Sequence, residues 1–102
     1  MIVTAWSNGS DGYGLKIAAK DRDQFFKREW ETVYLVLEGE PAPIQVNVRK
    51  QSFWNGTCRE LIHQEIGRWL QKNGLSPWAR NRPPKLQLDP IAERRFQLRK
   101  PL

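Results

Sequence analysis

The sequence predicts an α+β domain, built as a small open β-barrel (a pseudobarrel) of about six or seven short strands closed by two helices. Several short runs show alternating or β-branched apolar residues and are separated by turn residues, which is typical of strands. Two stretches between these runs have helical patterning instead. The chain has 102 residues, and 39% of them are hydrophobic, so we expect one domain spanning residues 1–102 around a single core.

The first part of the chain predicts two strands around a loop. Residues 2–6 form a short apolar run, and residues 15–18 alternate between apolar and polar types. Between them, residues 7–14 contain three glycines, which favour a loop.

A short helix and a hairpin are expected next. Asp21 is placed to cap a helix of about residues 21–27. Residues 32–37 are rich in Val, Leu and Tyr and predict a strand. After a Gly- and Pro-containing turn, residues 44–48 alternate strictly, which predicts a return strand with one buried face.

A longer helix of about residues 58–73 is the clearest helical pattern. Thr57 and Glu60 have the spacing of a capping box, which satisfies backbone donors at a helix start. Gly74 is expected to end the helix in a left-handed conformation, with Leu75 closing a Schellman motif. The apolar face predicted by this pattern consists of Cys58, Ile62, Ile66, Trp69 and Leu70.

The last part of the chain predicts a connector and two strands. Residues 76–84 are rich in proline and basic, and we interpret them as a stiff loop. Residues 85–88 and 95–98 alternate and predict strands, with a turn at Asp89–Pro90.

The charge of the chain is +6 and is unevenly distributed. Residues 1–48 contain five Lys or Arg and seven Asp or Glu, whereas residues 49–102 contain twelve and four. The basic surplus therefore lies in the second half. It is explained either by solubility alone or by a polyanionic partner such as a nucleic acid.

Several classes of function are disfavoured by the composition. Cys58 and His63 are the single cysteine and histidine, which excludes an internal disulfide and a Cys/His zinc site within one chain. We expect Cys58 in the core and His63 on the solvent side of its helix. No apolar run has the length of a membrane helix, and the N-terminus lacks signal-peptide features, so a cytoplasmic location is expected.

Catalytic motifs are also missing from the sequence. It contains no nucleophile elbow, no phosphate-binding loop and no His-Glu-x-x-His motif. Asp21 and Asp23 are close in sequence, but Asp21 is better explained as a helix cap. We therefore expect no enzyme activity, no metal and no cofactor.

A polar segment around an aromatic pair is the strongest candidate for binding. Gln and Asn can read adenine, Arg can read guanine, and Lys and Ser favour phosphates. Phe53 is expected in the core, whereas the place of Trp54 stays open. The candidate residues of this segment are Arg49, Lys50, Gln51, Ser52, Trp54, Asn55, Thr57 and Arg59.

Two further segments have binding potential. The loop at residues 7–14, ending near Lys16, is either a DNA-contacting arm or a flexible hairpin loop; its candidates are Ser7, Asn8 and Ser10. The basic residues 80–85 form either a positive ridge or a solvated connector. The core is the expected location of Trp6, Trp30 and Trp69.

The succession of these motifs resembles the plant-type "B-three" DNA-binding domain. Leu15-Lys16-Ile17 with Asp21–Phe26 resembles its opening strand and helix, and residues 32–48 resemble its central hairpin. Ser52-Phe53-Trp54-Asn55 is similar to the motif that enters its second arm. The stretch from Trp69 to Asn73-Gly74-Leu75 resembles the end of its helix. The same pseudobarrel forms the recognition domain of some bacterial restriction enzymes.

The resemblance covers about residues 2–99 and implies double-stranded DNA as partner, held in the major groove by two arms, residues 7–16 and 49–59. It implies base or near-base contacts for Gln51, Ser52, Asn55 and Arg59, and phosphate contacts for Lys16, Arg49 and Lys50. The chain departs from the family at Ser76–Pro84, where the family continues with Gly-Asp, and in a first arm that is less basic.

Other functions stay open at the level of sequence. A protein-interaction or accessory subunit would use the basic surface on an acidic partner. A recognition subunit of a nuclease or restriction system would need its catalytic part on another chain. Basic loops with aromatic residues also do not distinguish RNA from DNA.

Overall fold

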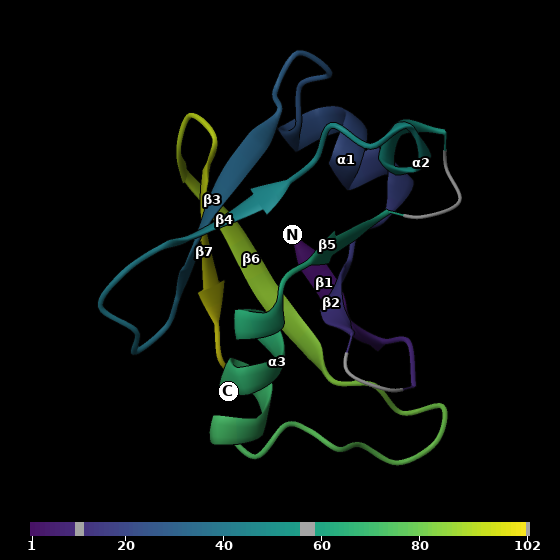
Figure 1. Ribbon diagram of the computed structural model, residues 1–102, viewed down its shortest axis with the longest axis vertical. Helices are drawn as coiled ribbons and strands as arrows, with labels where there is room; N and C mark the ends of the chain where they lie inside the picture. Colours follow the sequence, from purple (N-terminus) through teal and green to yellow (C-terminus); the bar gives the residue numbers. More distant parts are fainter. Residues whose placement is uncertain (10–11, 56–58, 102) are drawn as a thin grey trace.

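The computed structural model describes residues 1–9, 12–55 and 59–101. Its centre is a mixed sheet with the strand order β4-β3-β7-β6-β1-β2-β5 (Figure 1). The strands are β1 (Ile2–Ser7), β2 (Tyr13–Lys16), β3 (Thr32–Leu37), β4 (Ile44–Asn47), β5 (Glu60–Ile62), β6 (Lys85–Ala92) and β7 (Arg95–Arg99). Neighbouring strands are antiparallel except for β3 and β7, which run parallel.

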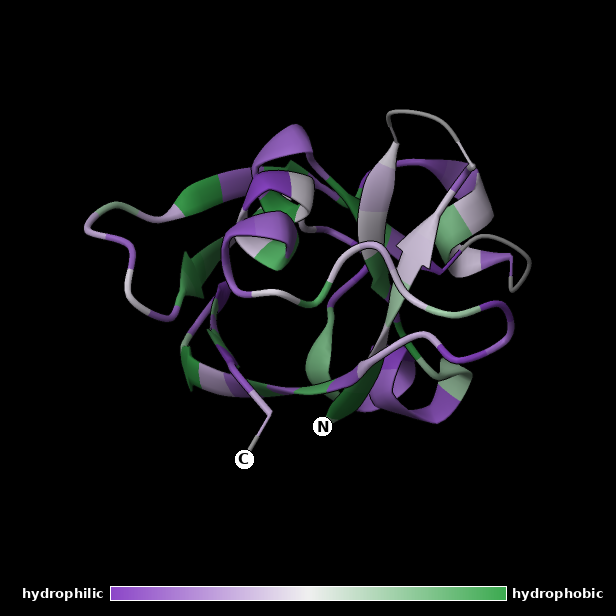
Figure 2. Cartoon of the chain, turned by 90° about the horizontal axis from the view of Figure 1, so that it is seen from below, coloured by the Kyte–Doolittle hydropathy of each residue, from purple (hydrophilic) through white to green (hydrophobic). Residues whose placement is uncertain are grey.

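The sheet curls into a nearly closed barrel. Its two edge strands, β4 and β5, contact each other without pairing as a ladder. Figure 2, which looks at the molecule from below, shows the strands arranged around a common centre. The predicted α+β pseudobarrel is therefore confirmed, and both the number of strands and their open closure agree with it.

Three short helices cover the barrel. They are α1 (Ala19–Phe25), α2 (Gln51–Trp54) and α3 (Gln64–Lys72). In Figure 1, α1 and α2 lie together at the upper right, and α3 lies at the bottom. Phe53 of α2 packs edge-on against Phe26, which stacks on Phe96 of β7 at a ring distance of 4.8 Å. At the other end, Ile66, Trp69 and Leu70 of α3 are buried in the same core.

The helix predicted over residues 58–73 is too long at its start. Glu60–Ile62 form strand β5, and α3 begins only at Gln64. His63 rather than Thr57 caps this helix, because its Nδ1 accepts a hydrogen bond from the backbone N–H of Glu65. The Thr-x-x-Glu spacing matches a capping box only locally. Glu60–Ile62 form a strand because they pair with β2. Ile62, expected on the buried face, is 43% exposed.

The end of α3 agrees with the sequence. The N–H of Leu75 donates to the carbonyl of Leu70, and the N–H of Gly74 donates to that of Gln71. These two bonds define a Schellman motif, and Gly74 has the left-handed φ of +71° that the motif requires. Cys58, expected in the core, lies outside the described residues.

Two other boundaries differ from the prediction. The first helix begins at Ala19 after the extended residue Ala18, with no side-chain cap, so Asp21 is inside its first turn. The turn between the last two strands is not at Asp89–Pro90, because β6 continues to Ala92 and Pro90 lies opposite Phe96. Strand pairing outweighed the turn propensity of the Asp-Pro pair, and the ladder is irregular between Pro90 and Ala92. Within the described part of the chain, no helix has the length and apolar character to span a membrane.

Candidate nucleic-acid interface

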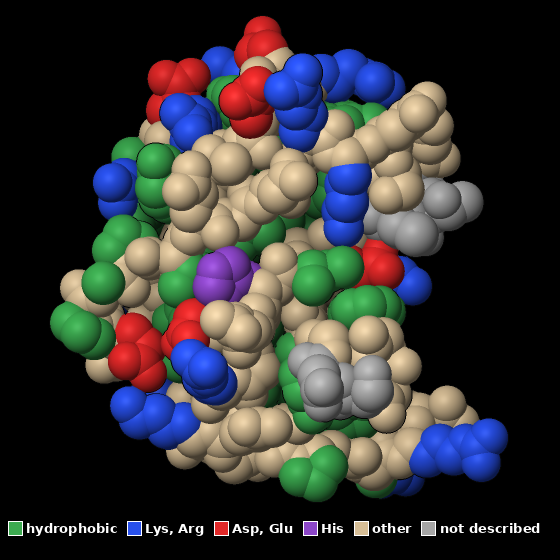
Figure 3. Space-filling view, viewed as in Figure 1, with side chains coloured by type: hydrophobic (Ala, Val, Ile, Leu, Met, Phe, Trp, Pro, Cys, Tyr) green, Lys and Arg blue, Asp and Glu red, His purple; other side chains and the backbone are tan. Residues whose placement is uncertain are grey.

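The two candidate arms start from neighbouring strands. The first arm (residues 7–16) joins β1 to β2, and the second arm (residues 49–59) joins β4 to β5. Because β2 and β5 are antiparallel neighbours, the two loops leave this pair at opposite ends. The first loop leaves where Gly14 faces Ile62, and the second leaves where Lys16 faces Glu60. The surface is indented on the right of Figure 3, below the second arm, and side chains of several types appear along it.

A short strip of strand surface connects the two arms. Two rows of paired residues cross β1, β2 and β5 with their side chains on the outer face, opposite to the buried Ala5, Leu15 and Leu61. Gly14 contributes no side chain, and a Cβ there would come within 2.5 Å of the Leu61 carbonyl oxygen. We call this strip the floor; its side chains are Thr4, Trp6, Lys16, Glu60 and Ile62.

Trp6 is on the floor and not in the core. Val3 and Ala5 of β1 are buried, so the alternation of the strand turns Trp6 outward, where it is half-buried. Its neighbour across the ladder is Gly14, which has no side chain to pack on the indole. The prediction of a core position was wrong for Trp6, whereas Trp69 is buried and Trp30 packs against the core.

Glu60 is an unusual member of the floor. It is only 6% exposed, although its partner across the ladder, Lys16, is exposed. Its Oε2 is buried and has no hydrogen-bond partner among the described residues. Buried carboxylate oxygens are normally hydrogen-bonded, because desolvation of an unpaired acceptor is costly. Glu60 therefore offers a free acceptor next to the second arm.

The second arm contains a helical turn that the sequence did not predict. In α2, Phe53 is fully buried, and Trp54 packs edge-on against it while donating from Nε1 to the Val48 carbonyl at 3.3 Å. The aromatic pair therefore holds the arm on the barrel, which settles the open position of Trp54 as a structural one. Gln51 and Asn55 lie one helical turn apart and are exposed.

The polar side chains of Gln51 and Ser52 in α2, and of Asn55 directly after it, are at least partly exposed. Neither Gln51, Ser52 nor Asn55 makes a side-chain hydrogen bond with another described residue, and Ser52 is half-buried. Their donors and acceptors are thus available to a ligand. Thr57, another candidate of this arm, lies outside the described residues.

Helix α1 supports the second arm through an arginine. Arg22 is 8% exposed, and its Nη1 donates to the Phe53 carbonyl at 2.9 Å. The guanidinium groups of Arg22 and Arg28 lie 5.6 Å and 5.1 Å from the centre of the Trp54 ring, within the range of cation–π contacts. A cation at the end of a helical turn also stabilises its carbonyl groups.

The basic candidates differ in their exposure and in the contacts that their side chains already make. Lys16 is exposed and Lys50 half-buried, and neither forms an ion pair with a described residue. Arg49 pairs with Glu31 at 2.7 Å, and both side chains are largely exposed. Arg59 donates from Nε to the Ile17 carbonyl at 2.9 Å, which links β5 to the segment after β2. Arg59 therefore has a structural contact as well as any contact with a ligand.

The first arm is a compact loop in the part that the structure describes. The N–H of Asn8 donates to the Gly12 carbonyl, and the Asn8 side-chain oxygen accepts from the N–H of Gly12. Ser7 Oγ accepts from the N–H of Gly9, which has a positive φ of +88°. Ser10 lies outside the described residues. Asn8 is exposed at the base of the arm, while Lys16 is at the far end of β2 and belongs to the floor.

The described candidates lie on the two arms or on the floor between them, and sequence reasoning missed three further residues of this region. Trp6 could have been found from the alternation of β1, in which Val3 and Ala5 share the other face. Glu60 was assigned to a helix cap, and only its pairing with Lys16 places it on the floor. No local sequence pattern indicated that Arg22 supports the second arm, because its partner Phe53 is distant in sequence.

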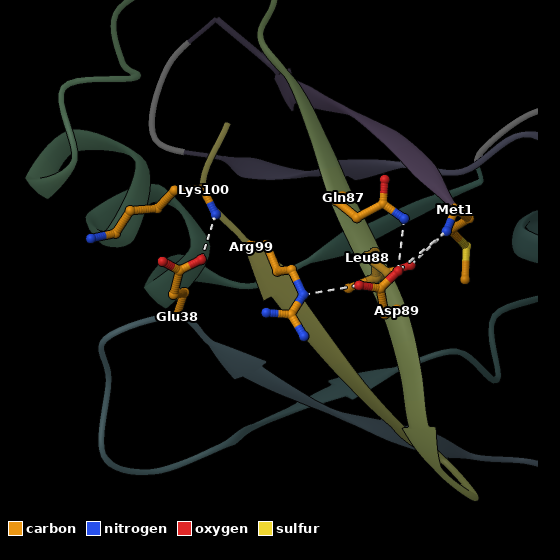
Figure 4. Close-up of polar contacts among 7 residues, drawn as sticks. All are labelled: Met1, Glu38, Gln87, Leu88, Asp89, Arg99 and Lys100. Atoms are coloured by element: carbon orange, nitrogen blue, oxygen red, sulfur yellow. Dashed lines mark hydrogen bonds and ion pairs between the residues drawn. The ribbon is translucent and has the colours of Figure 1, made fainter. Parts of the chain in front are cut away.

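A separate polar network lies on β6 and β7. Asp89 accepts from Gln87 Nε2 at 2.7 Å and from Arg99 Nε at 3.0 Å, and the N-terminal ammonium lies 3.9 Å from its carboxylate (Figure 4). These hydrogen bonds, first from Gln87 and then from Arg99, lower the pKa of Asp89 below its ordinary value of 3.8. This network concerns stability and lies on strands that do not carry the arms.

Comparisons with known proteins add no identity. No family model matches the chain, and neither a curated protein nor a solved structure is significantly similar to it. Among the described residues, no three His, Cys, Asp or Glu side chains gather into a group that would hold a metal ion.

Proposed function

We propose that this chain is a non-catalytic domain that binds double-stranded DNA with the two arms. The observation that carries the proposal is their common origin on the β2–β5 pair, at opposite ends of the floor. Two loops separated by a short strip of sheet can follow the two sides of a groove while the strip faces its edge. The resemblance to plant-type B-three domains supports the same arrangement.

The amides of the second arm are suited to reading bases. Gln51 and Asn55 are exposed, lie one helical turn apart and have no side-chain partners among the described residues. Each amide has a donor and an acceptor and can form the bidentate pair with adenine. Ser52 and Arg59 are close to them in the chain and extend the contact. The core anchor formed by Phe53 and Trp54 gives these side chains a fixed base.

Positive charge around the floor favours phosphates. Lys16 and Lys50 have no ionic partner among the described residues. The ion pair of Arg49 with Glu31 is exposed, and such pairs contribute only ~0–1 kcal/mol. Arg49 can therefore exchange Glu31 for a phosphate at a small cost in free energy. With ~5 phosphate contacts, the logarithm of affinity is expected to fall with the logarithm of salt concentration at a slope near −4.5.

The floor adds a second means of discrimination. The free Oε2 of Glu60 is an acceptor that fits the exocyclic amino group of cytosine or adenine. Trp6, two strands away in the other row of the floor, offers an apolar surface that suits the methyl group of thymine. Access to Glu60 requires a small displacement of its surroundings, because the group is buried.

Selection from a random double-stranded DNA pool, at near-physiological salt and read by sequencing, tests the proposal. The wild-type chain is compared with a Gln51→Ala/Asn55→Ala variant and with Gln71→Ala, a control exposed on α3. We expect a short enriched motif for the wild type and the control, and loss of enrichment for the double variant. Binding that shows no enrichment and vanishes as salt rises would refute sequence reading and direct the search to an acidic protein partner.

A further inference from the structure

A second concave site lies beside the first arm, on the side away from the second arm. In Figure 1, the connector from α3 to β6 runs below the first arm. Together they line an open surface pocket of about 350 Å³. This volume is within the ~300–1,000 Å³ of ligand pockets and suits a ligand of one or two rings. The residues that decide its chemistry are Ser7, Tyr13, Ser76, Trp78, Arg80 and Asn81.

Two aromatic rings form the apolar wall of the pocket. Tyr13 and Trp78 are both half-buried and line the pocket, so part of each ring is open to it. Their centres are 6.3 Å apart with planes at 80°, which fixes the rings edge to face. Tyr13 is further held by Ser76, whose Oγ donates to its hydroxyl at 3.3 Å. Rigid rings of this kind favour stacking with a planar ligand.

A tight turn supplies the polar wall. The N–H of Arg82 donates to the Ala79 carbonyl at 2.9 Å, so Arg80 and Asn81 occupy the centre of the turn. Asn81 adopts a positive φ of 63°, which asparagine tolerates better than most residues. Both side chains line the pocket, and neither makes a hydrogen bond or ion pair with another described residue. The indole N–H of Trp78 is likewise without such a partner.

The connector that carries these groups is fixed at both ends. At its start, Leu75 closes the Schellman motif of α3. At its end, the Pro84 carbonyl accepts from the N–H of Ala5 in β1 at 2.9 Å. The pocket is thus largely formed in the free protein, which lowers the entropic cost of binding.

The positive charge around the pocket favours an anionic ligand. Residues 73–88, which contain the connector, include three Lys or Arg and no Asp or Glu. The guanidinium of Arg80 is the cation that lines the pocket itself, and guanidinium groups form paired hydrogen bonds with phosphate. A ligand that combines a planar ring with a phosphate matches both walls.

We propose that this pocket binds a single nucleotide, with its base against Tyr13 and Trp78 and its phosphate on Arg80. The Asn81 amide and the Trp78 N–H supply donors and an acceptor for the base edge. The nucleotide is either a free mononucleotide or one unstacked residue of a nucleic-acid strand, since both present the same chemistry. The site shares Ser7 and Tyr13 with the first arm but uses no residue of the second arm, and it goes beyond the proposed duplex reading.

Titration of the ¹⁵N-labelled full chain with each of the deoxynucleoside monophosphates, followed by NMR, tests the proposal. We expect saturable shifts of Tyr13, Asn81 and the Trp78 indole signal, and weaker binding of the nucleosides that lack phosphate. Inorganic phosphate alone should bind much more weakly than the nucleotides. Equal binding of phosphate and nucleotides, or no shift at millimolar ligand, would overturn the proposal.

Matched variants distinguish binding in this pocket from nonspecific attraction of an anion to the positively charged surface. Arg80→Gln should weaken nucleotide binding about tenfold, equivalent to one charge-assisted hydrogen bond. Arg82→Gln removes the same charge two residues on, outside the pocket lining, and should change binding less than about twofold. Trp78→Ala should weaken nucleotides but not phosphate. Unshifted signals of β3 and β7 verify that each variant is folded. An equal loss in Arg80→Gln and Arg82→Gln would overturn the proposal.

A short single-stranded oligonucleotide then identifies the source of the ligand. Binding much tighter than that of mononucleotides, and lost in Arg80→Gln, identifies a residue of a strand; equal binding identifies a free nucleotide. The Gln51→Ala/Asn55→Ala variant should retain nucleotide binding. The two proposals can therefore fail separately. Nucleotide binding in the pocket is tested with Arg80→Gln, whereas duplex reading is tested with Gln51→Ala/Asn55→Ala.

Discussion

The ring of Tyr13 lies directly over Gly67 of α3. A Cβ built on Gly67 would come within 2.6 Å of Tyr13 Cδ2 and 2.9 Å of Cγ. Gly67 is itself buried, and the ring is held in place by the hydrogen bond from Ser76 and the edge-to-face contact with Trp78. The absence of a side chain at residue 67 therefore determines where β2 meets α3.

Gly67→Ala should destabilise the protein. Alanine is the better helix former by ~1 kcal/mol, but overpacking against Tyr13 is expected to cost ~1–3 kcal/mol. Urea denaturation should therefore show a lower free energy of unfolding. Gln71→Ala, an exposed position of the same helix, is the control and should stay within ~0.5 kcal/mol of wild type. A more stable Gly67→Ala protein would contradict the fixed position of Tyr13.

Arg22→Met should loosen the second arm. The change leaves the buried Phe53 carbonyl without its donor, which costs about 1–3 kcal/mol of stability. The backbone N–H of Asn55 donates to the Gln51 carbonyl, and its hydrogen exchange should become faster. Lys20→Met on the exposed side of α1 should leave both stability and exchange unchanged. Equal effects of the two changes would mean that Arg22 does not support the arm.

Asn55→Ala and Lys50→Ala should affect DNA binding differently. Loss of the amide removes a base contact and should cost ~1–3 kcal/mol on the preferred site while leaving other sequences unaffected. Loss of the cation should weaken all sequences alike and make the salt slope about 0.9 less steep. Fluorescence anisotropy on a selected site and on a scrambled duplex, over a salt series, measures both. An unchanged slope for Lys50→Ala would place this residue away from the phosphates.

Glu60→Gln should change which base is preferred without removing binding. The amide keeps the size of the side chain but replaces one acceptor oxygen with a donor. Enrichment of cytosine or adenine at one position of the selected motif should decrease, by a factor equivalent to ~1–3 kcal/mol. Identical motifs for the variant and the wild type would exclude a base contact by Glu60.

The Asp89 network should make stability depend on acid pH. Hydrogen bonds from Gln87 and Arg99 lower the pKa of Asp89 in the folded state below 3.8, the ordinary value that applies when the chain is unfolded. The contribution of Asp89 is therefore fully present above that value, and it is lost as pH falls through the folded-state pKa. Asp89→Asn should lower the free energy of unfolding at neutral pH by less than ~1 kcal/mol, because the pair with Arg99 is partly exposed.

Urea denaturation of both proteins from pH 7 down to pH 2 measures this contribution. The difference between wild type and Asp89→Asn should shrink only below the ordinary Asp pKa of 3.8. Gln24→Ala, an exposed position of α1, is the control. A difference that shrinks already near neutral pH would point to another titrating group.

The strands with local patterns were predictable from the sequence. Residues 32–37 form β3 as predicted, and residues 44–48 contain β4 with its alternation of buried and exposed positions. The stop of α3 at Gly74 was also predictable, because a Schellman motif is encoded by a few adjacent residues. The overall barrel followed from the number and order of these elements.

The features that were missed depend on partners far away in the chain. Glu60–Ile62 satisfied a helical pattern but became a strand through pairing with β2. The turn α2 is stabilised by Arg22, which no local pattern connects to Phe53. The pocket beside the first arm needs two loops that meet only in the folded protein. Local sequence rules cannot describe such contacts, because their energy comes from tertiary pairing.

The place of β7 in the sheet has a consequence for biosynthesis. This strand lies between β3 and β6, so its ladders connect the β4–β3 hairpin to the β6-β1-β2-β5 group. A ribosome delivers Leu35 well before Phe96, the residue that faces it in the parallel ladder. Until β7 leaves the exit tunnel, β3 exposes an unpaired edge, and such edges are prone to intermolecular association. Protection of the nascent chain at β3 is therefore a step at which a chaperone would improve the yield of folded protein.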